Sequence, residues 1–214
     1  MPTHKEHRKY CRERGISSEA CDFVNKLIDF PEEILPEVLK TKGLKSYLGE
    51  RLGRICEELI YAIYLNLEKP PSHGAVHGVW KGDCELTQAY RKMLEEIAGY
   101  FYGEEGREAV RLHLELDLPE HIEHELSLYL QEDVKGSEYI PYERRRLSIV
   151  DLLRRAIGKK DIEEIIRYIK RYGKIEKIKE IMNKQSCVVP GKTFGQLIEE
   201  IEELRWLKPL KDLV

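Results

Sequence analysis

The chain has 214 residues, of which 42% are hydrophobic, 35% are charged and 8% are aromatic. Its 36 Lys and Arg residues nearly balance its 39 Asp and Glu residues, and the formal net charge is −3. This composition excludes a disordered chain and argues against a generic nucleic-acid-binding protein, which carries a basic excess. No apolar run approaches the roughly 20 residues of a membrane helix, and no apolar segment follows the basic N-terminus as in a secretory signal. We therefore expect a soluble cytoplasmic protein without membrane insertion.

The first third of the chain shows apolar side chains at the three- and four-residue spacing that is typical of helices. Ser17 is placed to cap a helix that ends before Pro31. Pro31 is placed to open a second, short helix, which Pro36 is expected to interrupt. Residues 44–67 form the longest periodic run and predict one long helix.

The rest of the chain continues the helical pattern. After a glycine-rich loop, SHGAVHGVWKGD, Asp83 is placed to cap a helix that ends at Gly103. The segments EEGREAVRLHL and LDLPEHIEHELSLYLQED predict two more helices, and Pro119 suits the first turn of the second. The segment KIEKIKEIMNK predicts a further helix, and the remaining ones are expected to begin at Ser148, Asp161 and Thr193.

Composition changes near residues 134–143, where Gly, Ser and Pro cluster in VKGSEYIPYE. Residues 112–133 contain seven acids and no Lys or Arg, while residues 135–172 contain 11 Lys and Arg against 6 Asp and Glu. We expect an all-α fold, a single helical domain of roughly nine or ten helices. It consists of an acidic-centred part over 1–134 and a basic part over 135–214 that packs on it.

The five cysteines, at positions 11, 21, 56, 84 and 187, include no CxxC pair. This spacing argues against a zinc ribbon or a thioredoxin-type site and favours buried free thiols. The abundance of Lys, Glu, Arg and Tyr is typical of thermophile proteins.

Motifs of enzyme chemistry are missing from the sequence. It contains no Gly-x-Ser-x-Gly elbow, and neither GxxxxGK[ST] nor GxGxxG occurs. The Gly191-Lys192-Thr193 string lacks the earlier glycine and the preceding strand of a phosphate-binding loop. We therefore expect no enzyme, no catalytic residue and no cofactor.

Histidines suggest an alternative function as a metal-binding helical protein. His121 and His124 share a helix face, and Glu125 lies one turn from His121, although the order differs from the zincin motif. The loop histidines His73 and His77 are candidates for completing this set. A second set, in an N-terminus expected to be mobile, consists of His4, His7 and Cys11. Histidines bonded to carboxylates and to the backbone are the preferred explanation of both sets, and we predict no metal site.

Two features stand out against this helical background. One is the loop KPPSHGAVHGVWKGD, where two histidines and Trp80 lie among glycines and prolines. The other is LELDLPEHIEHEL, whose acids alternate with leucines. An apolar groove with an acidic rim suits a positively charged, partly apolar peptide.

These two features, in this order, resemble the TorD/DmsD/NarJ family of redox-enzyme maturation chaperones. Pro119, His121, Glu125 and Leu126 match the family's Pro-Asp-His-x-x-x-Glu-Leu pattern, and Glu120 stands where the family has Asp. Gly78-Val79-Trp80 is similar to the family's Ser-Val-aromatic loop, without the serine. The resemblance covers residues 17–133, and the basic C-terminal part departs from it.

The resemblance implies a cytoplasmic chaperone that binds the twin-arginine-type leader of a molybdenum or tungsten oxidoreductase subunit before export. It leaves open the client enzyme and the oligomeric state, with a homodimer among the options. The residues expected to bind the peptide are Asp117, Pro119, Glu120, His121, Glu123, Glu125, His73, His77 and Trp80.

A nucleic-acid-binding or assembly module is the other alternative. It would use the basic C-terminal helices, where Arg144-Arg145-Arg146 and Arg154-Arg155 are placed to meet phosphates. Ion pairing of these arginines with neighbouring glutamates explains the same pattern.

Overall fold

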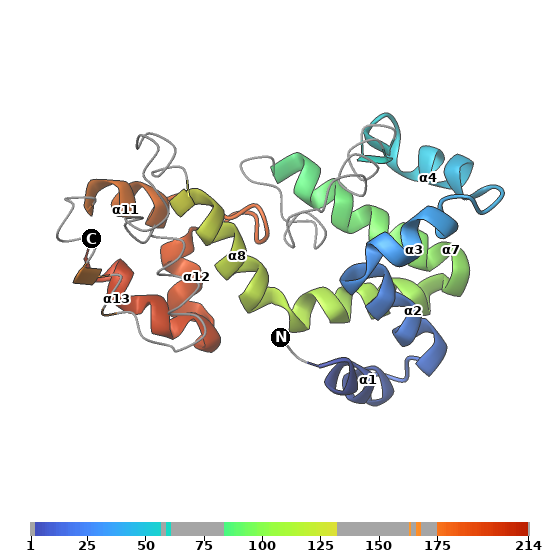
Figure 1. Ribbon diagram of the computed structural model, residues 1–214, viewed down its shortest axis with the longest axis horizontal. Coiled ribbons are helices and arrows are strands. Elements are labelled where there is room, and N and C mark those ends of the chain that lie inside the picture. The colour runs from blue at the N-terminus through green and yellow to red at the C-terminus, as the bar shows by residue number, and fades with distance from the viewer. Residues whose placement is uncertain are drawn as a thin grey trace, which may run out of the picture. The chain divides into compact units, whose positions relative to one another are not determined.

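The computed structural model describes residues 3–56, 59–60, 84–131, 163, 166–167 and 175–213, and every regular element in these ranges is helical (Figure 1). An isolated antiparallel bridge between Gln185 and Thr193 is the one β-type pairing among them. The all-α prediction is confirmed. The elements are α1 (His4–Glu13), α2 (Ser18–Asp29), α3 (Pro31–Val38), α4 (Leu44–Leu52), α7 (Cys84–Leu116), α8 (Leu118–Gln131), α11 (Ile175–Met182), α12 (Phe194–Glu200), the 3-10 helix η3 (Glu202–Leu207) and α13 (Lys208–Lys211).

The chain divides into two compact units, Met1–His121 and Ile122–Val214, called here unit 1 and unit 2. The sequence predicted a boundary at 134, but the division falls after His121, inside α8. The composition change at 134–143 lies outside the described residues. A helix that continues through a boundary leaves no local composition signal, which explains why the pattern missed it.

Unit 1 is built around α7. Helix α2 packs along α7, and α1 and α4 also contact it (Figure 1). The apolar stripe of α2 supplies Val24, Leu27 and Ile28, and α7 supplies Met93 and Leu94 to the same buried cluster. Burial of these side chains is the main force that holds the helices together.

Capping side chains fix the ends of several helices. The Ser17 hydroxyl accepts a hydrogen bond from the backbone N–H of Ala20, as its position predicted. The predicted cap at Thr193 is also confirmed, and it forms a capping box with Gln196. At the N-terminus, where mobility was expected, Thr3 and Glu6 form another capping box that starts α1.

Two expected helix boundaries are wrong. Helix α3 continues through Pro36 to Val38, because a proline in the second turn removes only one backbone hydrogen bond. The long helix expected over 44–67 ends at Leu52, because Gly53 adopts φ +62° and so leaves the helical conformation. Residues 57–58 and 61–67 of that segment lie outside the described residues, as do the predicted caps at Asp83, Ser148 and Asp161.

Helix α7 breaks at Gly103, where the sequence predicted a helix end. Gly103 has φ +63° inside α7, so α7 consists of two helical halves that fold back at this residue. The halves approach closely at Gly106, where an added Cβ would press against the carbonyl group of Ala98. Glycine is therefore required at 103 for conformation and at 106 for space.

A disulfide joins Cys11 of α1 to Cys21 of α2, and Cys84 and Cys187 are also disulfide-bonded, so the expectation of free thiols is wrong for these four cysteines. The turn between the helices returns α2 alongside α1 and brings the two Cα atoms to 6.3 Å, within the range that a disulfide spans. Cys56 is buried and is not part of a disulfide, as expected.

A polar triad connects α4 to both halves of α7. The Tyr47 hydroxyl donates to Glu96 Oε2 at 2.8 Å, and Arg107 Nη2 donates to the same oxygen at 3.1 Å. Arg107 Nη2 also donates to the Tyr47 hydroxyl oxygen at 2.7 Å. Burial raises the pKa of Glu96, but the bonds from Tyr47 and Arg107 outweigh it and hold that pKa below its ordinary value.

Glu96 is therefore expected to make unit 1 sensitive to acid. A carboxyl group with a lowered folded-state pKa stabilises the protein above its unfolded pKa of about 4.5, and this contribution is lost as pH falls through the folded-state value. In Glu96→Gln this loss is absent, so the difference in urea midpoint between wild type and variant should shrink on acidification from pH 6 to about pH 3. A difference that is constant with pH would contradict the prediction.

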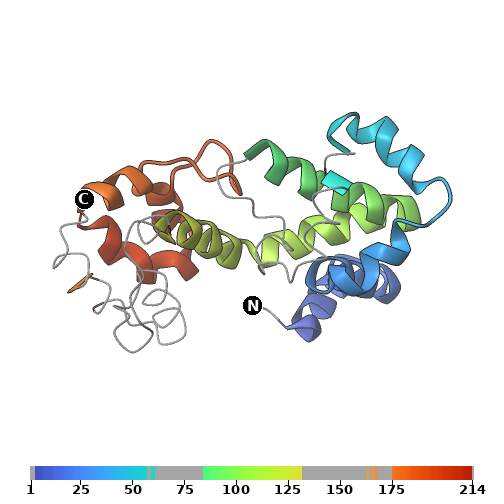
Figure 2. The ribbon, with the colours of Figure 1, turned by 45° about the horizontal axis from the view of Figure 1, so that its top comes forward.

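Unit 2 contains three helices that contact one another, α11, α12 and α13, with η3 between the last two (Figure 2). Helix α11 confirms the prediction for KIEKIKEIMNK and buries Ile178, Ile181 and Met182. Phe194 of α12 is fully buried and contacts the ring of Tyr129 from α8. The region after Met182, expected to be a polar break, forms a turn through Ser186 and Cys187 whose backbone is held by a buried carboxylate.

Candidate functional site

That carboxylate is Glu125, which the sequence assigned to peptide binding. Glu125 is fully buried. It accepts hydrogen bonds from the Ser186 hydroxyl at 2.6 Å and from the backbone N–H groups of Cys187 at 2.7 Å and Val188 at 3.3 Å. The expectation that Glu125 is available to a peptide is wrong, because its oxygens are used by the turn at 186–188.

His121, the predicted partner of the glycine-rich loop, is buried and contacts an arginine of α7. Arg91 Nη2 lies 3.0 Å from His121 Nδ1. Because arginine is always a donor, His121 Nδ1 accepts this bond and the ring carries its hydrogen on Nε2. Arg91 is seven residues after Cys84, the first residue of α7, and this distance corresponds to about 10 Å along a helix.

The remaining residues of the α8 motif are half-buried. Pro119 is the second residue of α8, where proline was expected, and Glu120 is beside it. Glu123 Oε1 accepts a hydrogen bond of 2.8 Å from the indole N–H of Trp206. Among the acids of α8, Glu120 and Glu123 are thus the two that keep partial exposure.

Several predicted residues fall outside the described part of the chain. These are the loop residues His73, His77 and Trp80, and the basic residues Arg144, Arg145, Arg146, Arg154 and Arg155. The groove between the loop and α8 stays a prediction for this reason. The predicted metal set of His121, His124 and Glu125 is not assembled, since Glu125 is held by the turn at 186–188 and His121 Nδ1 by Arg91.

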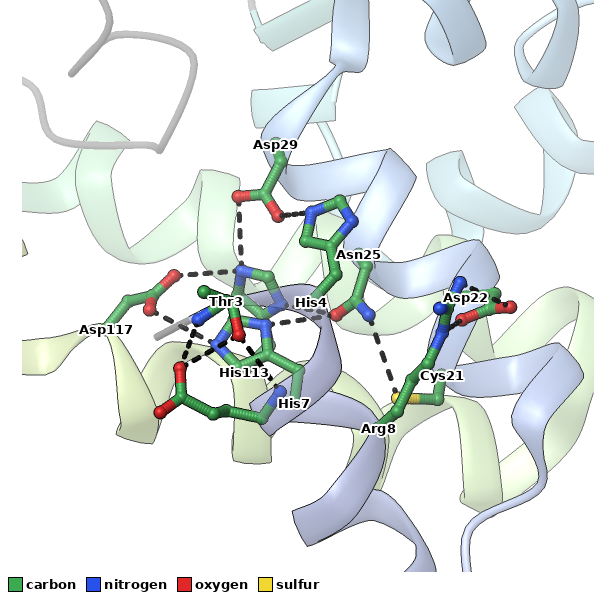
Figure 3. Close-up of polar contacts among 11 residues, drawn as sticks. Thr3, His4, His7, Arg8, Cys21, Asp22, Asn25, Asp29, His113 and Asp117 are labelled. Atoms are coloured by element: carbon green, nitrogen blue, oxygen red, sulfur yellow. Dashed lines mark hydrogen bonds and ion pairs between the residues drawn. The ribbon is translucent and has the colours of Figure 1, made fainter. Parts of the chain in front are cut away.

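Asp117 was expected on an exposed acidic face, and this is wrong. Its side chain is 1% exposed and lies between the rings of His7 and His113, which are also buried (Figure 3). His113 and Asp117 are four residues apart, so the turn of the helix brings them together. His7 comes from α1, in the segment where the sequence indicated a mobile set.

Around these three residues the structure gathers a larger polar cluster, the His–Asp cluster, made of His4, His7, Asn25, Asp29, His113 and Asp117 (Figure 3). Its elements are α1, α2 and the end of α7. Cys11, the third member of the set predicted at the N-terminus, is not part of it because its sulfur is in the disulfide.

Asn25 holds the two buried imidazoles from one side. Its Oδ1 lies 3.2 Å from His7 Nδ1 and 3.0 Å from His113 Nδ1. On the other side, His7 Nε2 is 3.4 Å from Asp117 Oδ1, and His113 Nε2 is 3.0 Å from Asp117 Oδ2. A second carboxylate completes the group, since Asp29 Oδ1 is 3.5 Å from His113 Nε2.

The charges of the cluster shift the ionisation of its members. Burial disfavours charged Asp117, but His113 and His7 outweigh burial and hold the pKa of Asp117 well below its ordinary value. Burial likewise disfavours charged His113, but Asp117 and Asp29 outweigh it and raise the pKa of His113. His7, Asp29 and His113 are the group of potential metal ligands that the described residues bring together.

Sequence patterns gave only part of this cluster. The Thr3-x-x-Glu6 capping box could have shown that α1 is ordered, and the spacing of His113 and Asp117 could have shown that they share a helix face. Nothing local indicates Asn25 or Asp29, because these residues reach the histidines through the packing of α2 on α7.

Comparison of the chain with protein-family models, with curated proteins and with solved structures gives no match. The resemblance to the maturation chaperones therefore stays a prediction from the motif. Among the described residues, no helix combines the length and the apolar character needed to cross a membrane.

Proposed function

We propose that the protein is a cytoplasmic maturation chaperone that binds the twin-arginine-type leader of a molybdenum or tungsten oxidoreductase subunit before export. The observation that carries the proposal is the contact between Arg91 and His121. It links the motif Pro119-Glu120-His121 to the part of α7 that directly follows the glycine-rich loop. The resemblance rests on the loop and this motif occurring in that order, and the contact supports it by joining the motif to the helix that follows the loop.

Glu120 and Glu123 are the residues of the motif suited to hold the leader. They are three residues apart on α8 and so share a face of that helix. A carboxylate can accept about four hydrogen bonds, so the bond from Trp206 to Glu123 is compatible with an arginine at the same carboxylate. Arginine binds carboxylates through two parallel N–H groups, which orients the bound peptide.

The proposal predicts that a synthetic twin-arginine leader binds the purified protein with micromolar or lower Kd in isothermal titration calorimetry. Glu120→Gln and Glu123→Gln should each weaken binding by roughly tenfold, because a charge-assisted hydrogen bond contributes about 1.5 kcal/mol. Glu50→Gln, an exposed acid of α4, serves as the matched control and should leave Kd unchanged.

Specificity is tested with a second peptide in which both arginines are replaced by lysine. This peptide keeps the charge but loses the bidentate geometry, so it should bind more weakly than the leader. Absence of binding to leaders from the same genome at low salt would refute the chaperone function, and equal binding by wild type and both glutamine variants would refute the assignment of the site.

A further inference from the structure

We infer that the His–Asp cluster of unit 1 is a buried site for a first-row transition-metal dication, with Zn²⁺ as the best fit. The ligands are His7, His113 and Asp29, whose ligand atoms lie within 4.8 Å of one another, and the Asp117 carboxylate lies beside both imidazoles. This site does not include Glu120 or Glu123, and it shares His7 with the N-terminal set that the sequence suggested.

The disulfide fixes the orientation of Asn25, and this is the first step of the inference. Asn25 Nδ2 lies 3.8 Å from the sulfur of Cys21, which carries no hydrogen because it is bonded to Cys11. A disulfide sulfur can only accept, so the amide nitrogen must face it. The amide oxygen of Asn25 therefore faces the two histidines.

That orientation fixes the tautomers of both histidines. Asn25 Oδ1 is an acceptor only, so Nδ1 of His7 and Nδ1 of His113 each carry a hydrogen. A neutral imidazole with hydrogen on Nδ1 presents a lone pair on Nε2. This arrangement is the one that metal-binding histidines adopt when their other nitrogen is held by an oxygen acceptor.

The two Nε2 lone pairs face carboxylate oxygens and not donors. Neither Nε2 atom nor either oxygen of Asp117 has a partner in hydrogen-bonding geometry, although they lie within ion-pair distance of one another. His7, His113 and Asp117 are at most 3% exposed, so water cannot compensate. In the neutral state of both rings these lone pairs repel one another, and either a proton on an imidazole or a metal ion between them relieves the repulsion.

Distances and charge both fit a metal dication. Ligands at about 2.1 Å from tetrahedral zinc lie roughly 3.4 Å from one another. The separations from Nε2 to carboxylate oxygen are 3.0, 3.4 and 3.5 Å. The carboxylates of Asp29 and Asp117 beside the two imidazoles favour a cation at this place. Imidazole and carboxylate together favour zinc and its first-row neighbours over Mg²⁺ or Ca²⁺.

Deep burial of the two histidines and their origin in different helices indicate a structural role. The three ligands come from α1, from the end of α2 and from α7, so one ion would connect three helices. His4 Nε2 lies 2.7 Å from Asp29 Oδ2 and orients this carboxylate as an outer partner. The alternative to a metal ion between the imidazoles and the carboxylates is a proton on one imidazole.

Titration of chelator-treated protein tests the inference. With Zn²⁺, we expect one ion per chain, micromolar or tighter Kd, and a rise in unfolding midpoint of roughly 5 to 10 °C at a hundredfold excess over Kd. With Co²⁺, visible d–d absorption of a tetrahedral site should appear. His7→Gln should lower Zn²⁺ affinity at least about 100-fold, and the matched control His124→Gln should retain it.

The variant Asp117→Asn shows whether the cation in the His–Asp cluster is a metal ion or a proton. The asparagine amide can donate to a lone pair on Nε2, so the metal-free variant should be at least as stable as metal-free wild type while its response to Zn²⁺ is lost. If the cluster instead holds a proton, this variant should be destabilised and wild type should not bind Zn²⁺ or Co²⁺. Either of these two results would overturn the inference.

A measurement on the wild-type protein tests the site without relying on any variant that could fail to fold. Nitrogen–proton correlation spectra of the imidazoles should show hydrogen on Nδ1 of His7 and His113, and added Zn²⁺ should shift their Nε2 resonances. Spectra that show hydrogen on Nε2 in both rings, unchanged by Zn²⁺, would overturn the site.

Discussion

Replacing Glu125 by alanine is expected to destabilise unit 2 by about 3–5 kcal/mol, a large share of the stability of a typical domain. The substitution removes the acceptor of the Ser186 hydroxyl and of the Cys187 N–H, and one of the two acceptors of the Val188 N–H, which also donates to Ser186 Oγ. Ser186 and Cys187 are 1% exposed, so water does not replace the lost carboxylate. Trp206 lies in unit 2, and its fluorescence during urea unfolding, in a Trp80→Phe background, measures the effect.

The matched control for Glu125 is Glu199→Ala in the same unit. Glu199 is exposed and pairs with Lys211 at 2.7 Å on the surface, where ion pairs contribute little. Its urea midpoint should stay close to that of wild type. A Glu125→Ala midpoint equal to that of the control would mean that the turn at 186–188 does not depend on this carboxylate.

The second large effect is expected for Gly106→Ala, which should lower the stability of unit 1 by about 3 kcal/mol. The new methyl group would press against the Ala98 carbonyl, with 2.7 Å between Cβ and the carbonyl carbon. Both atoms belong to the helical halves of α7, so a shift of either half disturbs the packing of α2 on α7. Thermal unfolding followed by circular dichroism measures the loss.

Gly49→Ala is the control of opposite sign. Gly49 lies inside α4, and nothing lies within 4 Å of an added Cβ. Alanine should therefore stabilise the helix by roughly 0.5–1 kcal/mol through propensity alone. If Gly106→Ala behaved like Gly49→Ala, the two halves of α7 would not be in close contact.

The sequence predicted correctly those helix ends that depend only on neighbouring residues. Ser17 and Thr193 cap helices because a short hydroxyl side chain reaches a free backbone N–H two or three residues later, whatever the rest of the chain does. Gly103 ends the first half of α7 because it adopts a positive φ, which glycine allows and other residues disfavour. Gly53 ends α4 for the same reason, but the apolar periodicity around it concealed the break.

Long-range packing explains the main errors. Asp117 and Glu125 belong to an acid-rich helix start, and charge alone predicted that both face solvent. Each is buried because a distant segment supplies its partners: His7 for Asp117, and the turn at 186–188 for Glu125. The sequence shows each carboxylate but gives no sign of the distant group that faces it.

The sequence by itself determined that this protein is helical, where several of its helices start and end, and that its N-terminal part contains the motif of α8. These depend on interactions between residues a few positions apart. The tertiary structure alone decided that His7, Asn25, Asp29, His113 and Asp117 meet. The physical reason is that burial makes each of these polar groups require a partner, and the partner's identity depends on how α1 and α2 pack on α7.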